Sequence, residues 1–275
     1  MSKRKRKPNK KTNENRRKEG RGTGVLGNYK PWLLIQDVAS LGLATRVKGL
    51  KTGRVHHLLS KLELSCFLCL DWAETVFDIR EQFPLYLLET LAIAKELNIK
   101  HPRVPVTKEV VVMTTDFLVT LRTASGDFKE IAVSAKYSKD LDNARSLEKL
   151  ELERFYWTRR GIEFFILTEK EINQTLVKNI DWLHSLALID FQALNIPLNV
   201  FSRAVKFMRR LLESMNIPLR NATNACDANF SFASGTSLLI VRYLIANRIW
   251  HIDLQTPIQP EKPITFTAFS KGGTV

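Results

Sequence analysis

Two acidic residues and a lysine could together form a site for cutting phosphodiester bonds. Asp116 follows a polar break at residues 114–115 in a segment of β-type composition, and Lys136 lies near the end of the next such segment. A turn at residues 125–127 would pair the two segments as a hairpin and bring both side chains to one end of a sheet. Glu63 projects from the helix expected before them. Carboxylate oxygens bind Mg²⁺, which activates water, and an ammonium group steadies the developing charge.

The same residues also fit ordinary structural roles. Asp116 could be a turn residue at the end of a strand, and Lys136 a solvated residue at a strand edge. Cys66 and Cys69 have the spacing of a redox or zinc motif, but no second ligand pair accompanies them. We interpret them as buried residues on a helix face. Spacing alone therefore indicates a nuclease-type site without excluding a structural one.

Four residues are expected to contact nucleic acid. Lys18 and Arg21 are interleaved with the glycines of residues 20–24, which let the backbone approach phosphates closely. Arg54 ends a basic turn, and His57 follows it closely. The alternatives are a flexible hinge for the glycine stretch and a structural hydrogen bond for His57.

The positive charge of the chain is concentrated in its first residues. Its 275 residues include 42 Lys or Arg and 28 Asp or Glu, which gives a formal net charge of +14. Residues 1–22 hold eleven of the basic residues and two of the acidic ones, so we expect an extended, solvated tail that binds a polyanion. No apolar signal-peptide core and no run of about 18 apolar residues occurs. We therefore expect a cytoplasmic protein without a membrane partner.

Hydrophobic patterning divides the chain into a basic tail with a Gly-rich arm, residues 1–24, and two domains. Residues 25–169 are predicted to form an α/β domain with a mixed central sheet flanked by helices. Its helices are expected at 60–72, 85–97 and 143–160, the first capped by Ser60 with Glu63 three residues on. Its strands are expected at residues 32–38, 44–48, 55–59, 76–85, 110–121, 128–136 and 162–167, the last as a buried strand.

The remaining residues, 170–275, are predicted to be mostly helical. Helices are expected at 171–188, 201–215 and 235–248, and two strand-like segments follow at 249–254 and 264–269. This order is the outline of a winged helix. The second of these helices carries one basic face, formed by Arg203, Lys206, Arg209 and Arg210, which could meet DNA or an acidic partner.

Eight sequence blocks between about residues 16 and 183 resemble the TnsA family, the endonuclease subunits of heteromeric, Tn-seven-like transposases. The blocks occur in order along the chain. They are KEGRGTG at 18–24, YKPW at 29–32, KTGRVHHLLS at 51–60 with LE at 62–63, DIREQFPL at 78–85, KHP at 100–102, MTTDFLV at 113–119, LEKLELER at 147–154 with YW at 156–157, and TEKEIN at 168–173.

The resemblance implies a restriction-endonuclease-like domain that nicks the 5′ ends of a transposon in a bacterial cell, where the protein would associate with the nucleoid when active. A TnsB-type transposase would cut and join the 3′ ends, and a TnsC-type ATPase regulator would contact the C-terminal domain. Glu63 would be the helix-borne acid, Asp116 the central metal ligand and Lys136 the lysine of the nuclease motif. The cofactor would be Mg²⁺, with Mn²⁺ as a substitute, and the substrate double-stranded DNA at the transposon ends.

One position departs from the family pattern. Two residues before the lysine these nucleases carry Glu, or Gln in TnsA, whereas this chain carries Ser134. The shorter serine would reach a metal only through water, or the neighbouring backbone carbonyl would act as the ligand. Glu153 lies on the helix after the catalytic strand, where it could support the site or be part of an ion-paired helix surface.

Two other functions remain open from the sequence. Ser134 could disable the site and leave a non-catalytic, DNA-binding subunit that bridges the same complex. A general restriction or repair nuclease with the same fold is the second alternative.

Overall fold

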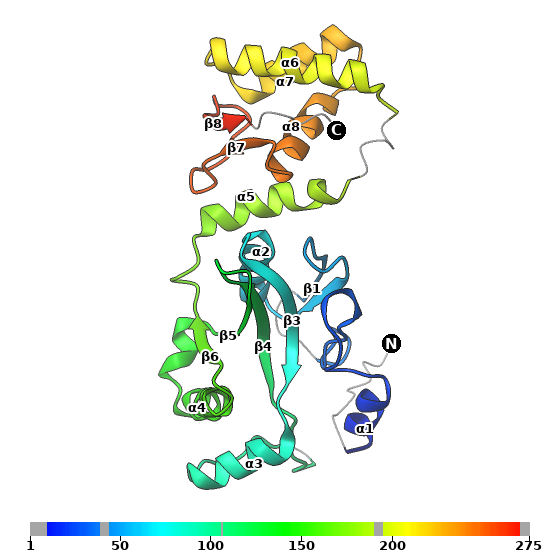
Figure 1. Cartoon of the computed structure of the whole chain (residues 1–275). Helices are drawn as coiled ribbons and strands as arrows, with labels where there is room; N and C mark the ends of the chain where they lie inside the picture. The colour runs from blue at the N-terminus through cyan, green and yellow to red at the C-terminus, as the bar shows by residue number, and fades with distance from the viewer. Residues whose placement is uncertain (1–9, 39–43, 106, 190–194, 270–275) are drawn as a thin grey trace, which may run out of the picture. The chain divides into compact units, whose positions relative to one another are not determined.

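The computed structural model describes residues 10–38, 44–105, 107–189 and 195–269 (Figure 1). The chain divides into two compact units, Met1–Ile172 and Asn173–Val275. No helix in the described segments is both long and apolar enough to cross a membrane.

The first unit is built on a mixed four-stranded sheet, as predicted. Its strands are β3 (Val76–Pro84), β4 (Thr114–Arg122), β5 (Phe128–Ala135) and β6 (Glu163–Leu167), in the order β3-β4-β5-β6. Neighbours pair antiparallel except for β5 and β6, which are parallel. The helix α4 (Ala144–Thr158) makes the crossover that a parallel pair requires.

A buried apolar cluster joins the helix α3 (Leu87–Glu96), α4 and the sheet. Its buried members are Leu85, Ile93, Ala94, Met113, Leu118, Ala132, Leu152, Tyr156 and Trp157. Side chains alternate along a strand, and Phe117 and Val119 on either side of Leu118 are also buried, so both faces of β4 are covered. Burial of each such side chain stabilises the folded state by about 1.5–3 kcal/mol. β4 is therefore a rigid base for the polar groups at its end.

A small hairpin and a capped helix precede the sheet. The strands β1 (Thr45–Lys48) and β2 (Val55–Leu58) pair antiparallel, and the helix α2 (Lys61–Trp72) follows. The Ser60 hydroxyl accepts the Glu63 N–H at 3.1 Å, and the Glu63 carboxylate accepts the Leu59 N–H at 2.9 Å. This confirms Ser60 as the cap of α2. The Glu63 side chain bonds the N–H of Leu59 instead of that of Ser60 expected in a capping box, and this bond fixes Glu63 in the first turn of α2.

The sequence predictions were wrong in three places in this unit. Residues 32–38 form turns instead of a strand, because the Asp37 carboxylate accepts the Leu34 N–H at 3.0 Å and pairs with Arg21. Residues 10–18 of the tail form the helix α1 (Lys10–Lys18), and its Arg16 is 6 % exposed against the Trp32 ring. β6 is not buried as predicted: it is the last strand of the sheet, and each of its residues is exposed or half-buried.

The first nine residues of the predicted tail lie outside the described segments. Two short 3₁₀ turns, Leu26–Asn28 and Ser138–Asp142, complete the first unit.

The described residues of the second unit form helical segments and a two-stranded sheet. They are α5 (Gln174–His184), a 3₁₀ turn (Ser185–Leu188), α6 (Leu198–Ser214), α7 (Leu219–Phe230), α8 (Thr236–Ala246), β7 (Trp250–Ile252) and β8 (Phe266–Phe269). The helix α7 was not predicted, since its sequence, LRNATNACDANF, holds three Asn, a Thr and an Asp, which have low helix propensity. The winged-helix assignment stays a prediction.

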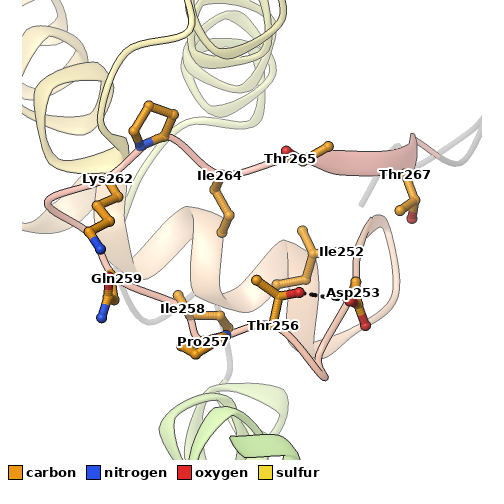
Figure 2. A pocket seen from close by; sticks show the side chains of 11 residues that line it. Ile252, Asp253, Thr256, Pro257, Ile258, Gln259, Lys262, Ile264, Thr265 and Thr267 are labelled. Atoms are coloured by element: carbon orange, nitrogen blue, oxygen red, sulfur yellow. Dashed lines mark hydrogen bonds between the residues drawn. The ribbon is translucent and has the colours of Figure 1, made fainter.

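The connection between β7 and β8 is anchored from α5. The Asn179 amide donates to the Leu254 and Thr256 carbonyls at 2.8 Å each and accepts the Ile258 N–H at 3.1 Å. A hollow of about 560 Å³ lies along this connection (Figure 2). Asp253 and Lys262 are the charged residues in its lining, so it offers no constellation for catalysis.

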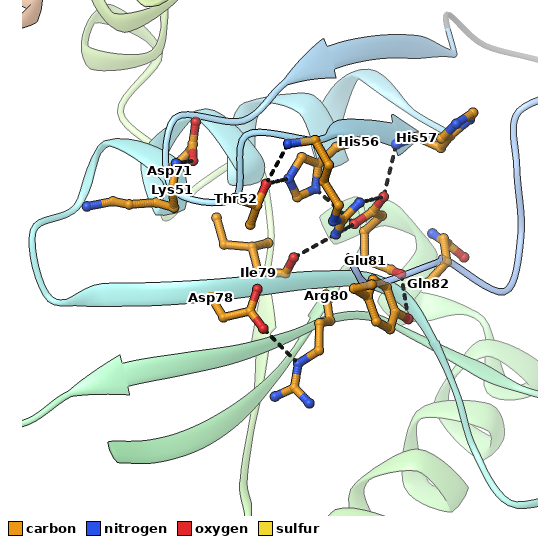
Figure 3. Close-up of polar contacts among 12 residues, drawn as sticks. Lys51, Thr52, His56, His57, Asp71, Asp78, Ile79, Arg80, Glu81 and Gln82 are labelled. Carbon is orange, nitrogen blue, oxygen red and sulfur yellow. Dashed lines mark hydrogen bonds and ion pairs between the residues drawn. The ribbon is translucent and has the colours of Figure 1, made fainter. Parts of the chain in front are cut away.

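A buried carboxylate ties the β1–β2 hairpin to the sheet (Figure 3). Glu81 in β3 is 0 % exposed and forms a bidentate ion pair with the Arg54 guanidinium. It also bonds His56 Nδ1 at 2.8 Å and accepts the His57 N–H at 3.1 Å. Burial alone would raise the pKa of Glu81, but the hydrogen bonds from Arg54 and His56 outweigh it and lower that pKa to about 2. The carboxylate is therefore charged and fully paired.

Removing the arginine should destabilise this unit strongly. We expect Arg54→Ala to lower the free energy of unfolding by about 3–5 kcal/mol, because Glu81 is left buried without its counter-ion. Urea denaturation at pH 7 measures the loss. Arg46→Ala is the matched control, since Arg46 is an exposed arginine in β1, and it should change the free energy by less than about 0.5 kcal/mol.

The loss of unfolding free energy in Arg54→Ala should depend on pH. Because pairing lowers the pKa of Glu81 from 4.5 to about 2, its contribution is fully present above pH 4.5 and is lost as the pH falls toward 2. The difference between the wild type and Arg54→Ala should shrink over that window. A deficit that is constant down to pH 2 would show that the lost stability does not come from the ion pair.

Candidate active site

Asp116 is the most highly coordinated side chain at the end of the β4–β5 ladder. Its Oδ2 accepts hydrogen bonds from Lys136 Nζ at 2.7 Å, the Ala135 N–H at 2.8 Å and the Ser134 hydroxyl at 3.2 Å. Phe117 pairs with Val133, so the next position along the ladder sets Asp116 opposite Ser134. The hairpin thus brings Asp116 and Lys136 together. Among the described residues no hydrogen bond reaches the second oxygen, Oδ1.

Lys136 is held as a cation by its surroundings. A third of its side chain is exposed. Burial lowers the pKa of the ammonium group, but the negative charges of Asp116 and Glu153 outweigh that effect and raise the pKa above its usual value. At neutral pH this group is therefore a hydrogen-bond donor and a positive charge.

Glu63 approaches the same region from the first turn of α2. It is 7 % exposed, and its Oε2 accepts bonds from the Leu59 N–H at 2.9 Å and from Gln82 Nε2 at 3.1 Å. Burial, together with the nearby charge of Asp116, raises the pKa of Glu63 to about 7. Both Glu63 and Asp116 thus interact with the positive charge of Lys136.

A third acid, Glu153, reaches the site from α4. It is 5 % exposed, and its side chain interacts with the hydroxyls of Thr115 and Ser134. Burial raises the pKa of Glu153 to about 8, with Lys136 opposing the rise and Asp116 adding to it. Its Oε1 is buried and has no hydrogen-bond partner among the residues that the structure describes. The helix α4, which follows β5 in the sequence, therefore faces the candidate site, which is the arrangement considered for Glu153.

The donor set suits a hard cation. Glu63 and Asp116 offer carboxylate oxygens, Asp116 Oδ1 is not engaged by hydrogen bonds from the described residues, and Ser134 adds a hydroxyl. No group of three or more His, Cys, Asp or Glu in the described segments forms a ready-made metal cage. Mg²⁺ is commonly held by one or two carboxylates with water and substrate phosphate as the other ligands. The residues present therefore fit Mg²⁺ better than a metal that needs a complete protein cage.

The four residues predicted to contact nucleic acid lie in the N-terminal arm and the β1–β2 hairpin. Lys18 is exposed, while Arg21 pairs with Asp37 and Arg54 with Glu81. His57 Nδ1 accepts the Ile35 N–H at 3.4 Å, and burial lowers the pKa of its imidazole. Arg21 and Arg54 thus have structural partners, and a DNA contact stays a prediction for all four.

Gln82 is a residue of the site that the sequence analysis did not nominate. It lies in β3, is 2 % exposed, and contacts Glu63. The signal available in the sequence was a run of charged and amide side chains, Asp78 to Gln82, within a strand that is otherwise apolar.

Comparisons with known proteins show the family of the chain. Residues 73–169 match the family model described as TnsA-like endonuclease N terminal, and residues 171–254 match TnsA endonuclease C terminal. The chain is 41 % identical over 230 residues to the transposon Tn7 transposition protein TnsA of Escherichia coli. That alignment covers 84 % of this chain and 81 % of the relative. The resemblance expected from the sequence is confirmed, and the chain belongs to the TnsA family of transposition endonucleases.

Proposed function

We propose that this protein cleaves the 5′ ends of a Tn7-like transposon by Mg²⁺-dependent phosphodiester hydrolysis, with Mn²⁺ able to replace Mg²⁺. It would act on double-stranded DNA together with a TnsB-type transposase and a TnsC-type ATPase. The observation that carries the proposal is the environment of Asp116, with Lys136 on Oδ2 and Oδ1 unengaged by the described residues, beside Glu63. Family membership supports the reaction class.

Each side chain would have a distinct task. Asp116 and Glu63 would hold the cation, which when bound supplies a Lewis acid for the scissile phosphate and its attacking water. Lys136 stays protonated, so it would donate a hydrogen bond to that water or to a phosphate oxygen. The Ala135 N–H and the Ser134 hydroxyl keep the Asp116 carboxylate in one orientation. The products would carry a 5′-phosphate and a 3′-hydroxyl.

Ser134 would support Asp116 more directly than it would bind metal. Its side chain is 0 % exposed, and its hydroxyl already donates to Asp116 Oδ2. A metal contact from this position would then come through water or through the backbone. The loss of the family's Gln is therefore compatible with an active enzyme.

Strand mapping on the assembled complex tests the reaction. With TnsB, TnsC, DNA bearing transposon ends and Mg²⁺, the wild type should cut the 5′ strands. Asp116→Ala should abolish the cuts, and Lys136→Ala should reduce the rate by about 10²–10³-fold, because a preorganised charge is removed. Lys129→Ala is the matched control, since Lys129 lies on β5, the strand that Lys136 directly follows, in an exposed ion pair with Glu163, and it should cut normally.

Other outcomes would select other functions. A wild type that never cuts, while the complex still assembles, would indicate a bridging subunit. Cutting that survives Asp116→Ala would refute the assignment of the site. Cutting of arbitrary DNA without partners would favour a general nuclease. Ser134→Gln with an unchanged Mg²⁺ requirement would show that the serine side chain is not a ligand.

The first residues of the chain would give DNA affinity that does not depend on sequence. Residues 3–7 are five consecutive Lys or Arg, whereas Arg16 and Arg21 belong to the folded unit. Replacing all five by Ser should flatten the dependence of log affinity on log salt by about 0.9 for each DNA phosphate that the tail no longer neutralises. Fluorescence anisotropy at several salt concentrations measures the slope. A variant with residues 3–9 in shuffled order keeps the charge and should match the wild type; an unchanged slope in the Ser variant would contradict the proposal.

We further propose that the basic face of α6 contacts the TnsC-type regulator. Arg203, Lys206 and Arg210 are exposed and follow one face of the helix, and they line a hollow of about 490 Å³ with Phe207 and Asn229. The Arg203 guanidinium lies 5.7 Å from the centroid of the Phe230 ring. Cations beside half-buried aromatic rings suit an acidic segment that also carries apolar side chains.

Charge reversal tests this surface. Lys206→Glu combined with Arg210→Glu should weaken binding of the regulator at least about tenfold, since two attractive contacts become repulsive. Biolayer interferometry with the purified regulator measures the affinity. Lys178→Glu, an exposed lysine of α5 in the same unit, should bind as the wild type does. Equal binding by the double variant and this control would exclude the α6 face.

A further inference from the structure

Gln82 has an unusual backbone for a residue inside a strand. It is a non-glycine residue with φ of 50°, in the left-handed region, yet it lies within β3 and is 2 % exposed. Side chains other than glycine adopt this region at a cost, and such residues persist where the surrounding structure determines them. A buried residue held in this conformation beside an active site indicates a function for that conformation.

The surroundings hold the Gln82 backbone in place. Its carbonyl accepts the Trp32 N–H at 3.2 Å, and the carbonyl of the preceding Glu81 accepts the Tyr29 hydroxyl at 3.1 Å. The side chain of Glu81 is fixed on β2, as Figure 3 shows. Residue 82 is therefore constrained both from residues 29–32 and from the hairpin.

The Gln82 side chain joins two elements of the candidate site. Its Nε2 donates to Glu63 Oε2 at 3.1 Å, and its Oε1 accepts the Thr114 hydroxyl at 3.2 Å. An ionised Glu63 only accepts hydrogen bonds, so the amide nitrogen faces the ionised form, and the Thr114 hydroxyl then suits the amide oxygen. The amide thus has one orientation.

The strand register sets Gln82 across from Asp116. Glu81 pairs with Phe117 and Phe83 with Thr115, so residue 82 lies between them and opposite residue 116. In a regular strand, consecutive side chains point to opposite faces. Here Glu81 contacts β2 and Gln82 contacts the first turn of α2, which directly follows β2. The left-handed backbone at Gln82 therefore lets the side chains of Glu81 and Gln82 contact two successive elements, β2 and α2.

We propose that Gln82 is a positioning residue that fixes the Glu63 carboxylate relative to Asp116 for cation binding. This inference rests on the proposed function and deepens it. The amide orients one oxygen of Glu63, so the other can be presented to a cation. Without the amide, Glu63 would keep its bond to the Leu59 N–H but lose its connection to the sheet.

Metal binding by the isolated full-length chain tests the inference without relying on cleavage. Calorimetric titration with Mn²⁺ in the presence of a DNA duplex should show binding about 10–100-fold weaker for Gln82→Leu, as is typical when a group that orients a ligand is lost. Gln82→Glu keeps the size but cannot donate to an ionised Glu63, and it should be similarly impaired.

A glycine variant separates positioning from folding. Gln82→Gly removes the amide but adopts positive φ readily, so its denaturation midpoint should be close to that of the wild type while its Mn²⁺ affinity falls as in Gln82→Leu. Asn98→Gly is the matched control, since Asn98 is an exposed residue with φ of 52° beyond α3. It should leave Mn²⁺ binding unchanged.

Cleavage by the assembled complex gives a second readout. Raising the Mg²⁺ concentration should restore 5′ cutting by Gln82→Leu, whereas Asp116→Ala should stay inactive. Wild-type affinity for Mn²⁺ in folded Gln82→Leu and Gln82→Gly would overturn the inference and leave the proposed function intact. Absence of Mn²⁺ binding by the wild-type chain would also overturn it. A wild type that binds Mn²⁺ through Asp116 but never cuts DNA would refute the proposed function alone.

Discussion

The buried carboxylate of Glu81 must be neutralised, and the way in which it is neutralised organises the first unit. An unpaired carboxylate in the interior is costly, so Arg54 and His56 have to reach it from the neighbouring hairpin. That requirement sets the hairpin against β3 and places the start of α2, with Glu63, near the strand. The Arg54 guanidinium also lies 5.0 Å from the centroid of the Tyr29 ring. This contact links the segment around Tyr29 to the cluster of Arg54, His56 and Glu81, which we call the Glu81 centre.

The candidate site differs from the cluster around Glu81 because it holds more acidic groups than basic ones. In the described part of the chain, the buried acids Glu63, Asp116 and Glu153 surround Lys136. Burial, together with the negative charge of Asp116, raises the pKa values of both Glu63 and Glu153. In a structural ion-pair network both carboxylate oxygens would have hydrogen-bond partners, as they do in Glu81. An excess of buried acid, with one carboxylate oxygen of Asp116 unengaged by those residues, is the condition that favours binding a cation.

The part of the fold that could be predicted from sequence is the part that local chemistry determines. A short turn fixes the register of β4 and β5, so the closeness of Asp116 and Lys136 followed from the turn at 125–127. A capping pattern likewise placed Glu63 in the first turn of its helix. Arg54 and Glu81 are 27 residues apart, and no local pattern reveals their ion pair. The exposure of β6 and the positive φ of Gln82 depend on strand order and tertiary contacts, which single-sequence periodicity does not contain.

The Glu81 centre also has the order of groups found in a hydrolase triad. The Thr52 hydroxyl lies 2.7 Å from His56 Nε2, and His56 Nδ1 lies 2.8 Å from the Glu81 carboxylate. Thr52 is only 7 % exposed, and the other two residues have no exposed surface, so a substrate carbonyl has no approach to the hydroxyl. In a protease, such a chain of hydrogen bonds polarises the nucleophile. In this protein the chain from Thr52 through His56 to Glu81 holds the β1–β2 hairpin in place. A hydroxyl, an imidazole and a carboxylate in this order can therefore act as a structural cluster when solvent and substrate cannot reach them, and their arrangement alone does not make the group reactive.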